Sequence, residues 1–208
     1  MKNERRAIRI PAFVLLWLAL LAQIGWVTFM RIDSHVRLAT MWYPLATVVC
    51  CLLVALTNGR IRWAATPLRL WIGFAFLQAV GDRFGLFGKP GAPGVAWGDF
   101  SHFIAYTAQV NSFLPHAIIP AIAVLATIAE VTFGFTMLFG IDIPDAALGS
   151  AILLFLFATA MTVSHLSQFS YSVYLMSASA LSLGSIDATF LSIDSVIRRR
   201  KALVVPAP

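Results

Sequence analysis

The run from Ala12 to Met30, AFVLLWLALLAQIGWVTFM, contains no charged residue and decides the class of fold. The hydrocarbon core of a bilayer is about 30 Å thick and a helix rises about 1.5 Å per residue, so a run of about 19 residues can cross it. The preceding Lys2, Arg5, Arg6 and Arg9 are typical of a signal peptide. Because no small-x-small cleavage site follows, we predict an uncleaved transmembrane helix.

Further apolar runs recur along the rest of the chain. Hydrophobic residues make up 60% of the sequence and charged residues only 12%, against about a quarter charged in a typical soluble domain. A water-soluble fold cannot hide that much apolar surface, so we predict an all-α, polytopic transmembrane helix bundle with six spans. The expected further spans are Met41–Thr57, Leu70–Gly88, Ala117–Gly140, Ala147–Ser164 and Phe169 to about Ser185.

The distribution of basic residues predicts the orientation. With the N-terminus inside, all but four of the 15 Lys and Arg residues fall on the cytoplasmic side, the exceptions being Arg31, Arg37, Arg83 and Lys89. Cytoplasmic loops carry an excess of Lys and Arg, so we predict that both termini are cytoplasmic. This orientation also accounts for the net charge of +6, which therefore does not indicate a nucleic-acid partner.

The connector after the third span is long and has a predicted helix of its own. Asp99 can cap a helix reaching about Leu114, whose apolar residues recur at helical spacing, and we expect this helix to lie in the outer interface. Trp42 is expected near the same interface and Trp71 near the inner one. At the start of the fifth span, Asp142 is expected to cap the helix.

Ionisable residues inside predicted spans mark a candidate site. Arg83 and Asp82 lie in the outer half of the third span, and Glu130 lies near the centre of the fourth. Side chains lean toward the N-terminal end of their helix, so Arg83 and Glu130 lean toward each other and are predicted to pair. A close helix contact is expected at Gly81–Gly85. The pair either fixes the packing or forms a proton or head-group site, because intramembrane charges are costly and are often functional.

All histidines, His35, His102, His116 and His165, fall at the predicted outer face. Hydrogen bonding in loops or at the interface explains them, and a proton or quinone role for one or two, with His102 and His165 as candidates, is the alternative. No metal-ligand spacing occurs, so we predict no metal site and no required cofactor, with a quinone as the candidate ligand. Cys50 and Cys51 are adjacent in an apolar run and are expected to pack as hydrophobes.

From Leu68 to about Ser185 the sequence resembles the DoxX family of four-helix bacterial membrane proteins. The resemblance implies a four-helix bundle over residues 67–190, preceded by a two-helix extension at 1–66 and followed by a basic cytoplasmic tail at 191–208. It implies the bacterial inner membrane and an association with quinone-linked or thiol oxidoreductases. The chain departs from the family in its extra N-terminal spans and in lacking a thiol pair at the outer face. The motifs that carry the resemblance are RLWIG at Arg69–Gly73, GDRFG at Gly81–Gly85, FIAY at Phe103–Tyr106, Leu114-Pro115, Ala129-Glu130, Gly134 and LFG at Leu138–Gly140.

Three functions are consistent with this sequence. The first is the membrane-anchor subunit of a quinone-linked oxidoreductase, with a quinone or lipid pocket and a docking face for partner subunits. The second is a non-catalytic structural subunit of a larger membrane complex, and the third is a small transporter with Glu130 as its proton-coupled group. No Walker motif, nucleophile elbow or dinucleotide fingerprint occurs, so autonomous catalysis is not expected. The candidate ligand-binding residues are Arg83, Glu130, Asp82, His165 and His102.

Overall fold

The chain is all-helical, as predicted. The computed structural model describes residues 2–33, 42–164 and 170–204, and no strand occurs within them. Short 3-10 turns at Arg62–Ala64 and His116–Ile118 lead into two of the helices. The helices are α1 (Lys2–Asp33), α2 (Trp42–Thr57), α3 (Ala65–Arg83), α4 (Phe100–Val110), α5 (Ile119–Phe139), α6 (Ile143–Val163), α7 (Ser170–Gly184) and α8 (Ile193–Val204).

Three helices in the described part of the chain are long and apolar enough to cross a membrane. They are Ala7–Ile32 in α1, His116–Phe139 in α5 with its leading turn, and Ile143–Val163, which is α6. The predicted second span, α2, is apolar but has only 16 residues, or about 24 Å of helix. The predicted third and sixth spans correspond to α3 and α7, which are not among the three helices that are long and apolar enough to cross a membrane. Membrane insertion is therefore supported by α1, α5 and α6.

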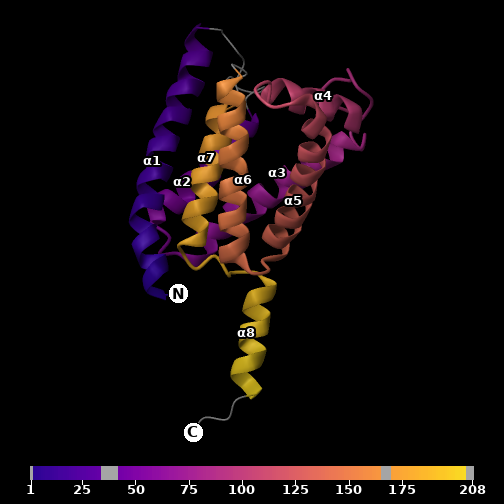
Figure 1. The fold of residues 1–208 in the computed structure, drawn as a ribbon. Coiled ribbons are helices and arrows are strands. Elements are labelled where there is room, and N and C mark those ends of the chain that lie inside the picture. Colours follow the sequence, from indigo (N-terminus) through magenta and orange to yellow (C-terminus); the bar gives the residue numbers. More distant parts are fainter. Residues whose placement is uncertain (1, 34–41, 165–169, 205–208) are drawn as a thin grey trace.

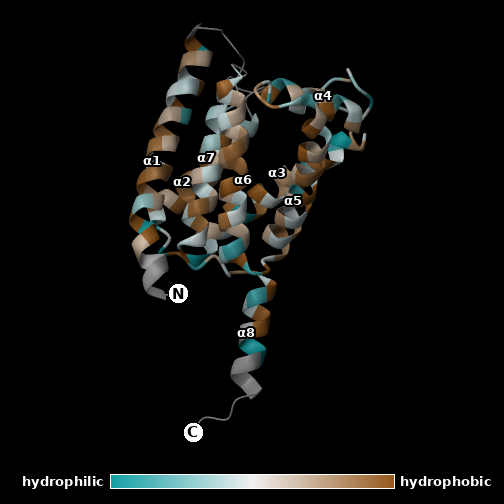
Figure 2. Cartoon of the chain, in the orientation of Figure 1, coloured by the Kyte–Doolittle hydropathy of each residue, from teal (hydrophilic) through white to brown (hydrophobic). Residues whose placement is uncertain are grey.

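The helices form one bundle with α4 set across one end (Figure 1). In the view of Figure 1, α7 lies between α1 and α6, and α5 pairs with α3 beyond α6. Figure 2 shows mostly hydrophobic residues along the coloured part of α1 and many hydrophilic residues in the connectors. Large apolar side chains on the outward faces of α1, α5 and α6 remain exposed, as expected for helices that face lipid tails.

Glycines set the distance between α3 and α5. A Cβ atom added to Gly73 would lie 2.9 Å from the carbonyl oxygen of Gly134, and one added to Gly134 would lie 2.6 Å from Cδ2 of Leu77. The backbones can approach only because both side chains are absent. The predicted contact at Gly81–Gly85 is wrong, since α3 ends at Arg83 and Gly85 lies in the turn that follows, at φ +74°.

The segments predicted to be cytoplasmic gather at one end of the bundle. A guanidinium nitrogen of Arg9 on α1 donates to the carbonyl oxygen of Asn58, after α2. Arg62, before α3, lies 3.0 Å from the carboxylate of Asp187, after α7. At the opposite end, Ser164 after α6 donates to the carbonyl oxygen of Val110 at the end of α4, over 2.7 Å. The helix ends thus group into the two sets that the sequence predicts.

One prediction about the interfaces is wrong. The rings of Trp42 and Trp71 lie 6.2 Å apart, and the indole nitrogen of Trp71 donates to Thr47 on α2 over 2.9 Å. The two tryptophans therefore do not mark opposite membrane interfaces. α2 has only 16 residues, and its first turn lies beside Trp71 in the first half of α3.

The basic tail begins as a helix that is tied to the bundle. The carboxylate of Asp194 on α8 accepts from the backbone N–H groups of Asp142 and Ile143, at 3.2 and 3.4 Å, and the N–H of Asp194 donates to the carbonyl oxygen of Gly140. Asp142 is the N-cap residue of α6 but its own side chain makes no capping hydrogen bond there, contrary to prediction. The anionic cap of α6 is supplied by a residue from a distant part of the chain.

Candidate ligand-binding cavity

The predicted ion pair between Arg83 and Glu130 is confirmed. Nη2 of Arg83, the last residue of α3, lies 2.7 Å from Oε1 of Glu130 on α5. The two side chains are only 3% and 2% exposed. Nη1 of Arg83 donates to the hydroxyl of Thr127 over 2.9 Å, one turn from Glu130 on the same face of α5. The pair joins α3 to α5 inside the bundle.

Aromatic rings cover the Arg83 guanidinium. Its central carbon lies 3.6 Å from the ring centroid of Phe103 on α4 and 5.1 Å from that of Trp97 in the connector before α4. A cation over the face of an aromatic ring is attracted by the ring quadrupole, and more strongly when water is excluded. Trp97 could not be predicted to belong to the site, because no sequence pattern in the connector indicates which ring reaches Arg83.

Asp82 lies next to Arg83 in the sequence but points elsewhere. Its Oδ2 accepts from the backbone N–H groups of Ala96 and Trp97, at 3.1 and 2.7 Å. Asp82 therefore holds the connector that places Trp97 over Arg83. It is buried, and it lines a second, smaller space of about 390 Å³ together with Gln78.

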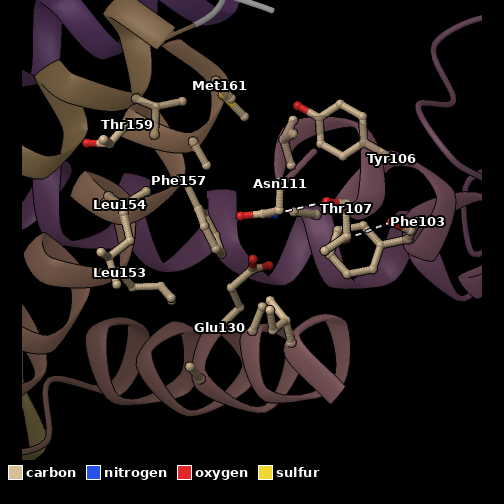
Figure 3. A pocket seen from close by; sticks show the side chains of 18 of the residues that line it. Phe103, Tyr106, Thr107, Asn111, Glu130, Leu153, Leu154, Phe157, Thr159 and Met161 are labelled. Atoms are coloured by element: carbon tan, nitrogen blue, oxygen red, sulfur yellow. Dashed lines mark hydrogen bonds between the residues drawn. The ribbon is translucent and has the colours of Figure 1, made fainter. Parts of the chain in front are cut away.

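A larger cavity of about 710 Å³ lies between α3, α5, α6 and α7, with α4 at one end. We call it the Glu130 cavity. Its volume falls within the range of about 300–1,000 Å³ that is usual for small-molecule sites. The lining is mainly apolar, and Figure 3 shows the Glu130 carboxylate pointing into the space toward the side chain of Asn111, with Tyr106 farther along the lining. The polar lining side chains are those of Tyr43, Arg83, Tyr106, Thr107, Asn111, Glu130 and Thr159.

Two polar atoms of the ion pair have no hydrogen-bond partner among the described residues. They are Nε of Arg83 and Oε2 of Glu130, and both are buried. A buried polar group without a partner costs about 1–3 kcal/mol, more when it is charged. A donor and an acceptor are thus left without a partner beside the polar end of the cavity.

Exposed lining residues on α5 and α6 indicate that the cavity opens sideways between these two helices. Leu125 on α5 and Leu156 on α6 belong to its lining and are 65% and 58% exposed. Phe113, which precedes α5, and Val163, at the end of α6, are also exposed lining residues. Because α5 and α6 are both candidate membrane helices, the opening lies on a flank that can face lipid.

His102 and His116, the histidines among the described residues, do not line this cavity. Nδ1 of His102 lies 2.9 Å from Oδ1 of Asp99 on the exposed side of α4, and His102 does not belong to the lining. Asp99 caps α4 as predicted, accepting from the backbone N–H of His102 over 2.8 Å, and this hydrogen bond is the main reason why the pKa of Asp99 is lowered. His35 and His165 lie outside the described residues, so the predicted role of His165 stays a prediction.

Neither metal nor thiol chemistry gains support in the described part of the chain. No group of three or more His, Cys, Asp or Glu side chains there could hold a metal ion. Cys50 and Cys51 are free, and Cys51 is fully buried in the hydrophobic core, as the apolar packing prediction requires.

Comparison of the chain with protein-family models, curated proteins and solved structures finds no match. The resemblance to the DoxX family therefore stays a prediction that rests on the short motifs themselves. A function must be argued from the cavity and its residues, because fold-level likeness alone is a weak indication of function.

Proposed function

We propose that the protein is the membrane subunit of a quinone-linked oxidoreductase and that the Glu130 cavity holds the quinone. The observation that carries the proposal is a largely apolar space of about 710 Å³ that ends at a buried ion pair and opens between two membrane helices. A lipid-soluble ligand needs such a lateral opening, because it arrives from the bilayer. Its polar head group needs hydrogen-bonding atoms within an apolar wall.

The proposed setting is the bacterial inner membrane, with six spans and both termini in the cytoplasm. In this arrangement α2, α3 and α7 cross the membrane together with α1, α5 and α6. Support comes from the grouping of Arg9, Asn58, Arg62 and Asp187 at one end of the bundle and from the excess of basic residues there. The short helices α2 and α7 can be accommodated by local thinning of the bilayer.

The electron donor in this proposal belongs to a partner subunit. The apolar cavity binds and positions a ligand, and the described residues contain no cluster suited to a metal centre. The DoxX resemblance agrees with such an accessory role.

The test is purification of the whole protein in a mild detergent, followed by extraction and identification of bound lipids. Leu156→Trp narrows the opening, so we expect quinone retention to fall strongly in this variant. Ile152→Trp provides a matched control, because Ile152 lies one turn earlier on α6, is 55% exposed and does not belong to the lining. Quinone retention should be unchanged in the control.

Two results would overturn the proposal. One is wild-type protein that carries no quinone and takes up none when quinone is added. The other is a stable complex with partner proteins in which both tryptophan variants assemble and act normally, which would support the structural-subunit alternative.

A further inference from the structure

The polar side chains of the Glu130 cavity differ in whether their donors and acceptors have hydrogen-bond partners within the protein. Most lining donors already have partners. The hydroxyls of Thr107 and Thr159 donate to the carbonyl oxygens of Phe103 and Phe155, each over 2.8 Å, and the amide nitrogen of Asn111 donates to the carbonyl oxygen of Thr107 over 2.9 Å. The two hydroxyl donors are therefore satisfied within the protein, and the Asn111 amide uses one of its two N–H donors in the same way.

The unsatisfied atoms come in a complementary pair. Nε of Arg83 is a donor and Oε2 of Glu130 is an acceptor, and both are buried without a partner in the described structure. Each is two covalent bonds away from an atom of the 2.7 Å hydrogen bond that joins the two residues. They therefore belong to the same buried contact, between two residues that line the cavity.

The chemistry of a head group decides which of these atoms it can satisfy. A carbonyl oxygen accepts but cannot donate, so it would leave Oε2 of Glu130 unsatisfied. An ammonium group donates but cannot accept, so it would leave Nε of Arg83 unsatisfied. A hydroxyl does both. An anionic head group is also disfavoured, because the carboxylate of Glu130 faces the same space (Figure 3).

The charge balance favours a neutral ligand. The Glu130 carboxylate is already compensated by Arg83 at 2.7 Å, and the guanidinium is covered by the rings of Phe103 and Trp97. Figure 3 shows the carbonyl oxygen of the Asn111 side chain turned toward the Glu130 carboxylate. A second acceptor on that side again suits a group that donates a proton.

We propose that the Glu130 cavity selects a neutral, lipid-soluble ligand with a hydroxyl head group. The hydroxyl donates to Oε2 of Glu130 and accepts from Nε of Arg83. This inference rests on the proposed function, within which it assigns the cavity to the reduced form, the quinol, in preference to the quinone. The proposal concerns binding of the two forms and includes no electron-transfer step.

The experiment compares three ligands on the unchanged full-length protein in detergent, under anaerobic conditions. They are a decyl-substituted benzoquinone, its quinol, and the dimethyl ether of that quinol, which keeps the shape but cannot donate. Binding is followed by tryptophan fluorescence, because Trp97 lines the cavity. We expect the quinol to bind about tenfold more tightly than the quinone or the ether, since satisfying one buried acceptor is worth roughly that factor.

A variant adds a second test of the same contact. Glu130→Gln replaces the acceptor-only carboxylate with an amide that also donates, so the preference for the quinol should fall to about unity. If this variant does not fold, the comparison of quinol and ether on the wild-type protein still decides the question.

The outcomes separate this inference from the proposed function. If none of the three ligands binds, the proposed function fails. If the quinone or the ether binds as tightly as the quinol, the cavity still holds a quinone-type ligand but the hydroxyl selection is overturned, and a water molecule between Arg83 and Glu130 would explain the two open atoms.

Discussion

Nη2 of Arg83 lies 2.7 Å from Oε1 of Glu130, which is 47 residues further along the chain, and the contact is buried between α3 and α5. Two opposite charges in a space of low polarity depend on each other, because removing one leaves the other without compensation. This dependence gives the first prediction.

Arg83→Gln and Glu130→Gln should each lower the stability of the protein in detergent by about 3–5 kcal/mol, and the double variant should recover part of the loss. The measurement is the midpoint of thermal unfolding for the wild type, both single variants and the double variant. Strictly additive losses would show that the two side chains do not stabilise each other.

Asp82→Ala should release the connector before α4. The carboxylate of Asp82 holds the amides of Ala96 and Trp97, so both amides should exchange hydrogen faster in the variant, and stability should fall by about 1–3 kcal/mol. The measurement is amide hydrogen exchange resolved to short peptides. Asp145→Ala is the control, because Asp145 is an exposed residue at the start of α6, and it should leave exchange at Ala96 and Trp97 unchanged.

The ion pair could be predicted from the expected depth of its residues in the membrane and from the free energy that an unpaired charge costs there. Arg83 and Glu130 lie in apolar segments, where an unpaired charge is strongly unfavourable. Because their helices run in opposite directions, the two side chains lean toward each other, and pairing is the arrangement of lowest free energy. Trp97 could not be found in this way. Its position depends on the path of a connector rich in glycine and proline, and that path is fixed by Asp82, whose acidic side chain gives no hint of its backbone partners.

The number of spans was harder to predict than the fold class. Helix content follows from long apolar runs, but α2 ends after 16 residues and its first turn lies beside Trp71 on α3. The position of α2 relative to α3 is set by tertiary packing, and the hydropathy of the sequence does not predict it. The cap of α6 shows the same limit, because Asp194 is 52 residues from Asp142 and no local pattern links them.

The stability of α4 should depend on pH through Asp99. Its pKa is lowered below the ordinary value of 3.8, chiefly because its carboxylate accepts the backbone N–H of His102. The stabilisation is therefore fully present above 3.8 and is lost as the pH falls through the lower, folded-state pKa. Amide exchange at the first turn of α4 should rise in that acidic range. Asp99→Asn keeps a capping oxygen and should remove the pH dependence, whereas an unaltered profile in Asp99→Asn would contradict the assignment.

Asp194→Ala should loosen the junction between α6 and α8. Loss of a capping side chain costs about 0.5–2 kcal/mol, and the amides of Asp142 and Ile143 should exchange faster. Asp194→Asn retains one acceptor and should lie between the wild type and the alanine variant. Equal exchange at Asp142 and Ile143 in all three proteins would show that Asp194 does not cap α6.

The last prediction concerns the membrane itself. The structure gathers Asn58, Arg62 and Asp187 at one end of the bundle and Val110 and Ser164 at the other, and the basic residues cluster at the first end. If the six helices cross in alternate directions, reporter fusions after Arg60 and after Arg200 should read cytoplasmic, since positively charged loops stay inside.

A fusion within residues 91–97, before α4, should read external in the same experiment. The informative control is a fusion after Arg60 in protein that lacks the charges of Arg60 and Arg62, because weaker cytoplasmic retention there would tie the orientation to those residues. An external reading after Arg200 would leave an odd number of crossings. In that case α2 or α7, the two shortest of the six helices, would lie in the membrane without passing through it.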